Sequence, residues 1–239
     1  MDSKLDEFVQ KLKSSAGANL KAVALYGSAV TGEFHSKHSD LNILCILEQV
    51  DAARIGALHS SVEWWLRQGH RAPLLFTSEE ISHSADVFAI ELLDMKTHHR
   101  VLYGEDVFAG VAVPLQYHAI QVKRELRTDW LRLRQAILIA PKKGDAYLSL
   151  MTSSFSAFAA LFRHALIALG EPSAGNKREA IEQVGRFANA DPSGFLTILE
   201  FREGKRKQRE IVIEETLKRY FAFVEAVTGE FDRQLDARK

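Results

Sequence analysis

The sequence predicts an α/β domain of the α+β type with a mixed sheet, followed by an all-α helical bundle. In the first 110 residues, short apolar runs bounded by polar turns alternate with segments of helical periodicity. Beyond Pro114 only segments of helical periodicity remain. Such a change marks a boundary between two architectures, so we expect two domains, 1–110 and 111–239.

The first domain is expected to contain four strands and three helices. Apolar residues recur at helical spacing from Leu5 to Leu12 and predict a short amphipathic helix. A second helix is expected over 51–69, and a third begins at the capping sequence TSEE at 77–80. The expected strands are short apolar runs at 21–26, 41–47, 73–76 and 87–93.

The second domain is expected to contain five helices. Val122, Leu126 and Trp130 mark the first, which stops before Pro141. The second is rich in Ala, Phe and Leu and ends at Gly170. After the helix through 122–137, the helices are expected over 148–169, 177–189, 195–203 and 210–235.

Composition is that of an ordinary soluble protein, with 46% apolar and 26% charged residues. The N-terminal segment lacks the apolar core of a signal peptide, and no apolar run approaches the ~18–20 residues that span a bilayer. The single cysteine, Cys45, falls in an apolar strand and cannot form an internal disulfide. We therefore expect a cytoplasmic protein with no membrane partner.

Charge is unevenly distributed although the formal net charge is zero. Up to Gly110 there are 15 acidic against 10 basic residues, and after it 16 acidic against 21 basic. An acidic half suits cations, and a basic half suits phosphates. No aromatic residues interleave with the basic run FREGKRKQRE at 201–210, so no long nucleic acid partner is expected. A homo-oligomer is compatible with the sequence.

Polar residues stand at the facing ends of the first two strands. Gly27 and Ser28 follow the first strand, and Asp40 and Asn42 open the second. Side chains alternate along a strand, so Asp40 and Asn42 point to one face, about 6–7 Å apart, where their oxygens can share a hard cation. A helical turn that starts at Gly27 would favour a phosphate at its N-terminus.

The stretch LYGSAVTGEFHSKHSDLNILCIL, residues 25–47, resembles the signature of the DNA polymerase β-like nucleotidyltransferase superfamily. In that family a strand and Gly-Ser are followed, after a loop, by Ser-Asp-x-(Asp/Glu). The appended helices resemble those of small bacterial members, including aminoglycoside nucleotidyltransferases and minimal antitoxin-type enzymes. In that family the Gly-Ser pair binds the triphosphate and three carboxylates hold two Mg²⁺ ions. The resemblance implies that Gly27, Ser28 and Ser39 bind a nucleoside triphosphate and that this chain holds Mg²⁺, with one ion only as the alternative.

Carried over by position, Asp40 is the first metal carboxylate, and Asn42 takes the place of the second. The third is Glu91 in the predicted strand 87–93, or Asp94 just past it. We favour Glu91, because a lone acid in an apolar strand needs a cation or a hydrogen-bonding partner. A lysine or arginine partner is the alternative for Glu91.

The resemblance implies transfer of a nucleoside monophosphate from Mg·NTP to a hydroxyl of a small-molecule or protein acceptor. Asn42 removes one negative charge from a site meant for two Mg²⁺ ions, so the second ion binds more weakly. The alternative is therefore a non-catalytic nucleotide-binding or partner-binding protein, including an antitoxin-like module.

Other candidates are basic and histidine residues. Lys123 lies with Arg127 and Arg134 on one helical stripe, which is either a solvated face or a basic wall that contacts the triphosphate. His35 and His38 lie in the loop before Asp40, where histidines are usually solvated. The HHR sequence at 98–100 lacks metal-ligand spacing and is expected to form a surface turn.

Overall fold

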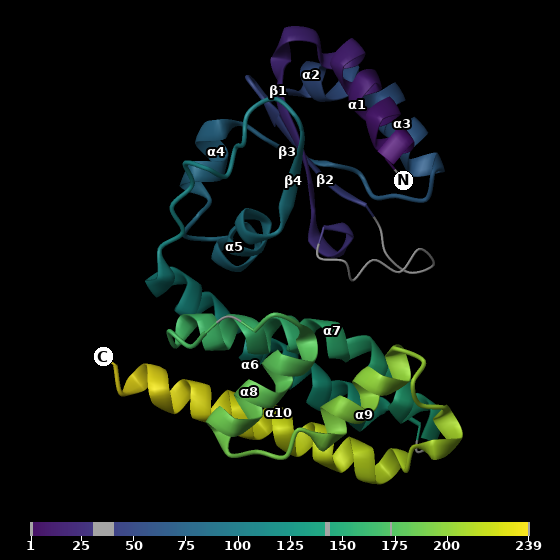
Figure 1. Ribbon diagram of the computed structural model, residues 1–239, viewed down its shortest axis with the longest axis vertical. Coiled ribbons are helices and arrows are strands. Elements are labelled where there is room, and N and C mark those ends of the chain that lie inside the picture. Colours follow the sequence, from purple (N-terminus) through teal and green to yellow (C-terminus); the bar gives the residue numbers. More distant parts are fainter. Residues whose placement is uncertain (1, 31–40, 142–143, 173, 239) are drawn as a thin grey trace. The chain divides into compact units, whose positions relative to one another are not determined.

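The computed structural model describes residues 2–30, 41–141, 144–172 and 174–238. The chain divides into two compact units, Met1–Pro114 and Leu115–Lys239, each with its own core (Figure 1). The division falls four residues after the expected position at residue 110.

The first unit is built on a four-stranded sheet with the order β3-β2-β1-β4. β1 pairs antiparallel with both β2 and β4, whereas β2 and β3 are parallel, so the sheet is mixed, as expected. The strands are β1 (Leu20–Tyr26), β2 (Asn42–Leu47), β3 (Leu74–Phe76) and β4 (His99–Tyr103).

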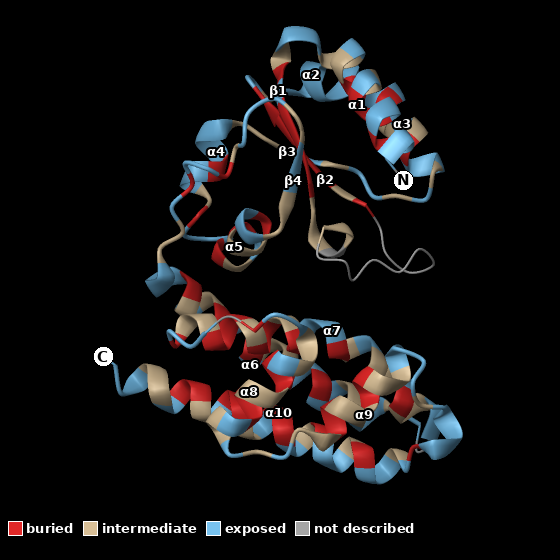
Figure 2. Ribbon diagram, in the orientation of Figure 1, coloured by how far each residue is buried: buried red, intermediate tan, exposed pale blue. Residues whose placement is uncertain are grey.

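Helices cover both faces of this sheet (Figure 1). Alternate residues of β1 and β2 pack on one side against α1 (Asp2–Ala16) and α3 (His59–Arg67). The other face packs against α4 (Ser78–His83) and α5 (Ala89–Thr97). Figure 2 shows the buried residues concentrated along the central strands and on the inward sides of the helices. The remaining short elements are α2 (Ala52–Ala57), η1 (Gly17–Asn19) and η2 (Gly27–Ala29).

Two expectations for the first unit are wrong. The predicted strand at 87–93 is instead the start of α5, which buries Ala89, Leu92 and Met95 at helical spacing against the sheet. The fourth strand is β4, so His99 and Arg100 belong to a strand rather than to a surface turn. A short apolar run such as VFAIELL fits a buried strand or a buried helix equally well, which explains the error.

The second unit is an all-α bundle, as expected. α7 contacts each of the other four long elements, and aromatic side chains fill the core around it, among them Phe158, Phe162 and Tyr220. The elements are α6 (Leu115–Ile139), α7 (Gly144–Ala168), α8 (Lys177–Ala188), α9 (Ser193–Arg202), η3 (Gln208–Glu210) and α10 (Ile213–Asp236).

α7 is long and apolar enough to cross a membrane by length and composition, contrary to the expectation from the sequence. Half of its most apolar 18-residue window is buried inside the protein, where it packs against α6, α8, α9 and α10. These are the features of the core helix of a bundle.

Candidate functional site

One end of the sheet carries the residues singled out in the sequence. Tyr26, at the end of β1, pairs with Asn42 on one side and with His99 on the other. Directly paired residues of antiparallel strands project their side chains to the same face. Asn42, Tyr26 and His99 therefore form a row across three strands.

Gly27 closes this end of β1. Its φ of +81° lies in the region that favours glycine, and it begins the short turn η2, which also contains Ser28. The N–H of Val30 donates to the carbonyl oxygen of Gly27 over 2.9 Å. A Cβ atom at position 27 would lie 3.0 Å from Nδ2 of Asn42, so the turn and the Asn42 side chain meet directly.

Asn42 is half-buried at the first position of β2. Its side chain projects to the same face as Leu44 and Ile46, which is the face covered by α4 and α5. Ser39 and Asp40, the other expected ligands of this stretch, lie outside the described residues.

The acidic candidates Glu91 and Asp94 lie on α5, not on a strand. Glu91 is exposed and Asp94 is half-buried, so the reason for preferring Glu91, its burial in an apolar strand, does not hold. Glu91 and Asp94 are three residues apart on α5, so their side chains are neighbours on the helix surface. The helix packs through Leu92 against the face of the sheet that carries Asn42. Either carboxylate thus comes from a helix on the relevant side of the sheet.

The donors expected at this end are oxygens, which suits Mg²⁺ better than softer metals. Within the described ranges, His, Cys, Asp and Glu form no cluster of three that could hold a metal ion. The ligand set expected from the sequence is Asp40, which lies outside the described residues, with the amide oxygen of Asn42 and a carboxylate that the structure places on α5. This donor set has one charge fewer than three carboxylates would provide.

Two further residues reach this end of the sheet and were not singled out from the sequence. β3 runs parallel to β2, with Leu74 paired to Leu44, so the residues before β3 lie beside the start of β2. The N–H of Leu41 points at Nδ1 of His70 over 3.5 Å, a long contact, and Arg71 follows His70. The signal that places them is the parallel pairing of β2 and β3, which local sequence does not reveal.

His99 is held by its neighbours. Its Nε2 lies 3.0 Å from a carboxylate oxygen of Asp106, and its Nδ1 lies 3.2 Å from the carbonyl oxygen of Lys96. The ring packs against Phe108 with centroids 4.7 Å apart. With both ring nitrogens engaged, His99 joins the end of α5 to the segment after β4.

The basic stripe of α6 is paired within the bundle. Lys123 contacts Asp236 over 3.2 Å and Asp232 over 3.7 Å, and Arg127 also pairs with Asp232. Arg134, farther along the stripe, lies 3.7 Å from a carboxylate oxygen of α10. These ion pairs join α6 to α10, which supports a structural role for Lys123.

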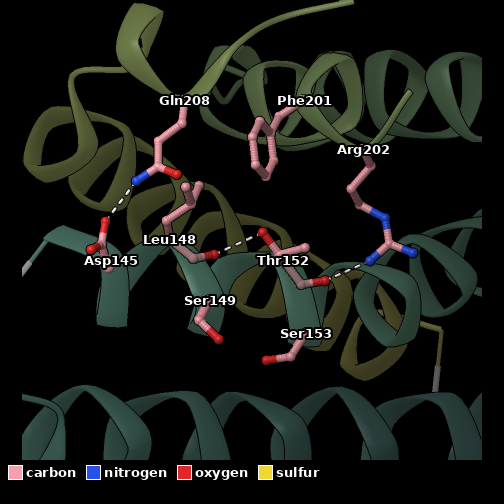
Figure 3. A pocket seen from close by; sticks show the side chains of 8 residues that line it. All are labelled: Asp145, Leu148, Ser149, Thr152, Ser153, Phe201, Arg202 and Gln208. Atoms are coloured by element: carbon pink, nitrogen blue, oxygen red, sulfur yellow. Dashed lines mark hydrogen bonds between the residues drawn. The ribbon is translucent and has the colours of Figure 1, made fainter. Parts of the chain in front are cut away.

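The second unit also has an open hollow of about 460 Å³ between α7, the end of α9 and η3 (Figure 3). Arg202 donates to the carbonyl oxygen of Thr152 over 2.6 Å and to the Ser156 hydroxyl over 3.0 Å. The Gln208 amide donates to Asp145 over 2.6 Å. The polar groups of this hollow are thus largely engaged with one another. Arg202 and Gln208 belong to the basic run at 201–210, which the sequence did not indicate as a binding site.

Comparisons with known proteins bear on the fold. No family model matches the chain, and no curated protein matches it. The chain is similar to the spectinomycin adenyltransferase AAD(9) from Enterococcus faecialis, solved with ATP and spectinomycin: the TM-score is 0.57 and the identity 13%, over 92% of this chain and 98% of that one.

A toxin–antitoxin structure with AMP-PNP matches 56% of this chain and 94% of its own, with 20% identity and a TM-score of 0.31, which is too low to carry an argument. At 13% identity, the likeness to the adenyltransferase shows the fold alone. The chain has the fold of a nucleotidyltransferase, an α/β domain followed by a helical C-terminal part.

Proposed function

We propose that the chain binds a nucleoside triphosphate with Mg²⁺ at the end of the sheet where Gly27 meets Asn42. The observation that carries the proposal is this contact, because it brings the Gly-Ser turn and the metal-ligand position together across two strands. Turn N–H groups would bind phosphate oxygens, and Asp40 with Asn42 would bind the cation. Bound Mg²⁺ would neutralise part of the triphosphate charge.

The reaction that this arrangement supports is nucleotidyl transfer to a hydroxyl. The acceptor oxygen forms a bond to the α-phosphorus, the bond between that phosphorus and the bridging oxygen breaks, and pyrophosphate leaves. The hydroxyl proton passes to a carboxylate of α5, Glu91 or its neighbour Asp94. The similar adenyltransferase structure holds ATP and spectinomycin, which favours a small hydroxylated molecule as acceptor here.

Asn42 favours a second function, nucleotide binding without efficient transfer. Its neutral amide gives the site less charge with which to hold two ions that repel each other. The chain would then act as a nucleotide-dependent binding protein that keeps the fold of the enzyme.

Calorimetry with Mg·ATP tests the binding proposal. We expect saturable binding by the wild-type chain and loss of binding in Asp40→Ala. The matched control is Asp6→Ala, which removes the same charge from an exposed position of α1. Unchanged affinity in Asp40→Ala would overturn the site, and a pyrophosphate-release assay on the wild type then separates transfer from binding alone.

A further inference from the structure

Each of the four strands begins or finishes at the end of the sheet that carries the proposed site. β1 ends there with Tyr26, β2 and β4 begin there with Asn42 and His99, and β3 begins beside β2 because the two are parallel. The residues just before β3 therefore lie at the same end of the sheet. They include Arg71, an exposed residue in the acidic half of the chain.

Two observations place Arg71 near the start of β2, where Asn42 lies. The long contact from the Leu41 N–H to His70 joins the residue before Asn42 to the residue before Arg71. Burial raises the pKa of Tyr26, and the positive charge of Arg71 acts in the opposite direction. Tyr26 pairs with Asn42 across β1 and β2, so Arg71 lies close enough to this pair for its charge to act on the Tyr26 hydroxyl.

We propose that Arg71 binds the phosphate groups of the nucleotide and supplies positive charge that a second metal ion would otherwise provide beside Asn42. The inference rests on the proposed nucleotide site. An arginine presents five donors in a planar fork that matches phosphate oxygens, and it keeps its charge at every physiological pH. The loss of negative charge at Asn42 and the presence of Arg71 are then complementary, because a carboxylate at position 42 would favour a metal and attract the guanidinium away from the phosphates.

The test compares the binding of ATP and of inorganic tripolyphosphate, each at fixed Mg²⁺, to wild type, Arg71→Gln and Arg71→Lys. We expect Arg71→Gln to weaken the binding of both ligands by roughly 10- to 100-fold, which is the effect of losing a charge-assisted hydrogen bond. Arg71→Lys should lie between, since it keeps the charge and loses the fork. A loss for ATP but not for tripolyphosphate would place Arg71 on another part of the nucleotide and overturn the proposal.

Arg67→Gln is the matched control. Arg67 lies four residues earlier, is mostly exposed and pairs with Glu63 over 2.7 Å. Because both residues are arginines, the two variants change the net charge of the protein equally. We expect its affinities to equal those of wild type; a loss as large as that of Arg71→Gln would reveal a general charge effect and overturn the specific contact. Circular dichroism of each variant verifies the fold.

A second measurement tests the relation to the metal. In the Asn42→Asp background at high Mg²⁺, the loss caused by Arg71→Gln should be smaller, because a second ion can replace the guanidinium. If Arg71→Gln lowers ATP affinity equally in both backgrounds, Arg71 does not take the place of a second metal ion. If wild type binds ATP and Arg71→Gln binds it equally well, this inference alone fails; if wild type binds neither ligand, the proposed nucleotide site fails and this inference falls with it.

Discussion

Gly27 and Asn42 meet across the gap between β1 and β2, and a side chain at position 27 would press on the Asn42 amide. A Cβ atom at position 27 would approach Nδ2 of Asn42 to 3.0 Å, and the φ of +81° is itself unfavourable for other residues. The same pair lies at the proposed phosphate site, so we expect a substitution at Gly27 to affect stability and nucleotide binding together.

Gly27→Ala should therefore lower both stability and nucleotide affinity. We expect a loss of about 1–3 kcal/mol in the free energy of unfolding, typical of backbone strain. Gly17→Ala is the control, because Gly17 has a φ of +56° but no neighbour within 4 Å of a Cβ. The difference between the two variants in the free energy of unfolding, measured in urea, gives the effect of crowding Asn42. Equal losses of stability and an unchanged ATP affinity would show that Gly27 does not affect stability and binding together.

A second glycine tests the packing of the bundle. A Cβ on Gly194 of α9 would lie 2.5 Å from the backbone nitrogen of Tyr220 on α10, so the two helices would have to separate. Gly194→Ala should destabilise the chain by about 1–3 kcal/mol or more. Gly229→Ala, with nothing within 4 Å, should instead stabilise α10 by roughly 0.5–1 kcal/mol. Thermal unfolding that ranks the two variants in the opposite order would exclude this close helix contact.

Local sequence predicted those features that depend on nearby residues. The periodicity from Val122 to Trp130 indicated α6, and the polar turn after an apolar run indicated the end of β1 at Tyr26. The face that Asn42 shares with Leu44 follows from strand alternation alone. For these features, neighbouring residues decide the outcome.

Features that depend on distant partners could not be predicted. The segment around Glu91 is apolar enough for a strand or a helix, and packing on the sheet selects the helix. The place of Arg71 depends on which strand β3 joins and in which direction. The partners of Lys123 lie on α10, more than a hundred residues later, and helical spacing cannot reveal them.

Lys123 provides a direct test of the two roles considered for it. Its pairs with Asp232 and Asp236 are partly exposed, so Lys123→Gln should lower the unfolding free energy by no more than ~1 kcal/mol. ATP affinity should stay at the wild-type value. A clear fall in ATP affinity with unchanged stability would instead identify Lys123 as a phosphate ligand.

Cys45 can report on the first unit. It is the only cysteine in the sequence and is fully buried in β2, and burial raises the pKa of its thiol to about 12. Because the thiolate is the reactive form, modification at pH 8 should require unfolding. Native labelling should be at least ~1000-fold slower than labelling in guanidinium, since single domains unfold at a cost of about 5 kcal/mol or more. Equal rates would show that β2 is open.

The same thiol provides a binding assay for the first unit. A ligand that binds only the native state at a hundred times its Kd adds about 2.7 kcal/mol of stability, which slows labelling roughly 100-fold. Mg·ATP should give this protection, and adenosine, which lacks phosphates, should give much less. Equal protection by Mg·ATP and adenosine would show that the phosphate groups do not contribute to binding.

Asn42→Asp tests whether the position on β2 limits the chemistry. Aspartate is nearly the size of asparagine and should fit beside Gly27 without repacking, while its charge strengthens the binding of a second Mg²⁺. We expect the variant to bind Mg²⁺·ATP at lower Mg²⁺ concentration than wild type and to release pyrophosphate faster when a hydroxylated acceptor is present. Asn42→Ala is the control, because it has no ligand oxygen and should lose metal-dependent affinity. If Asn42→Asp gains Mg²⁺ affinity without transfer, the donors on α5 do not reach the acceptor, and binding alone is the function of this site. If it gains neither, the Gly27–Asn42 contact does not mark a metal site.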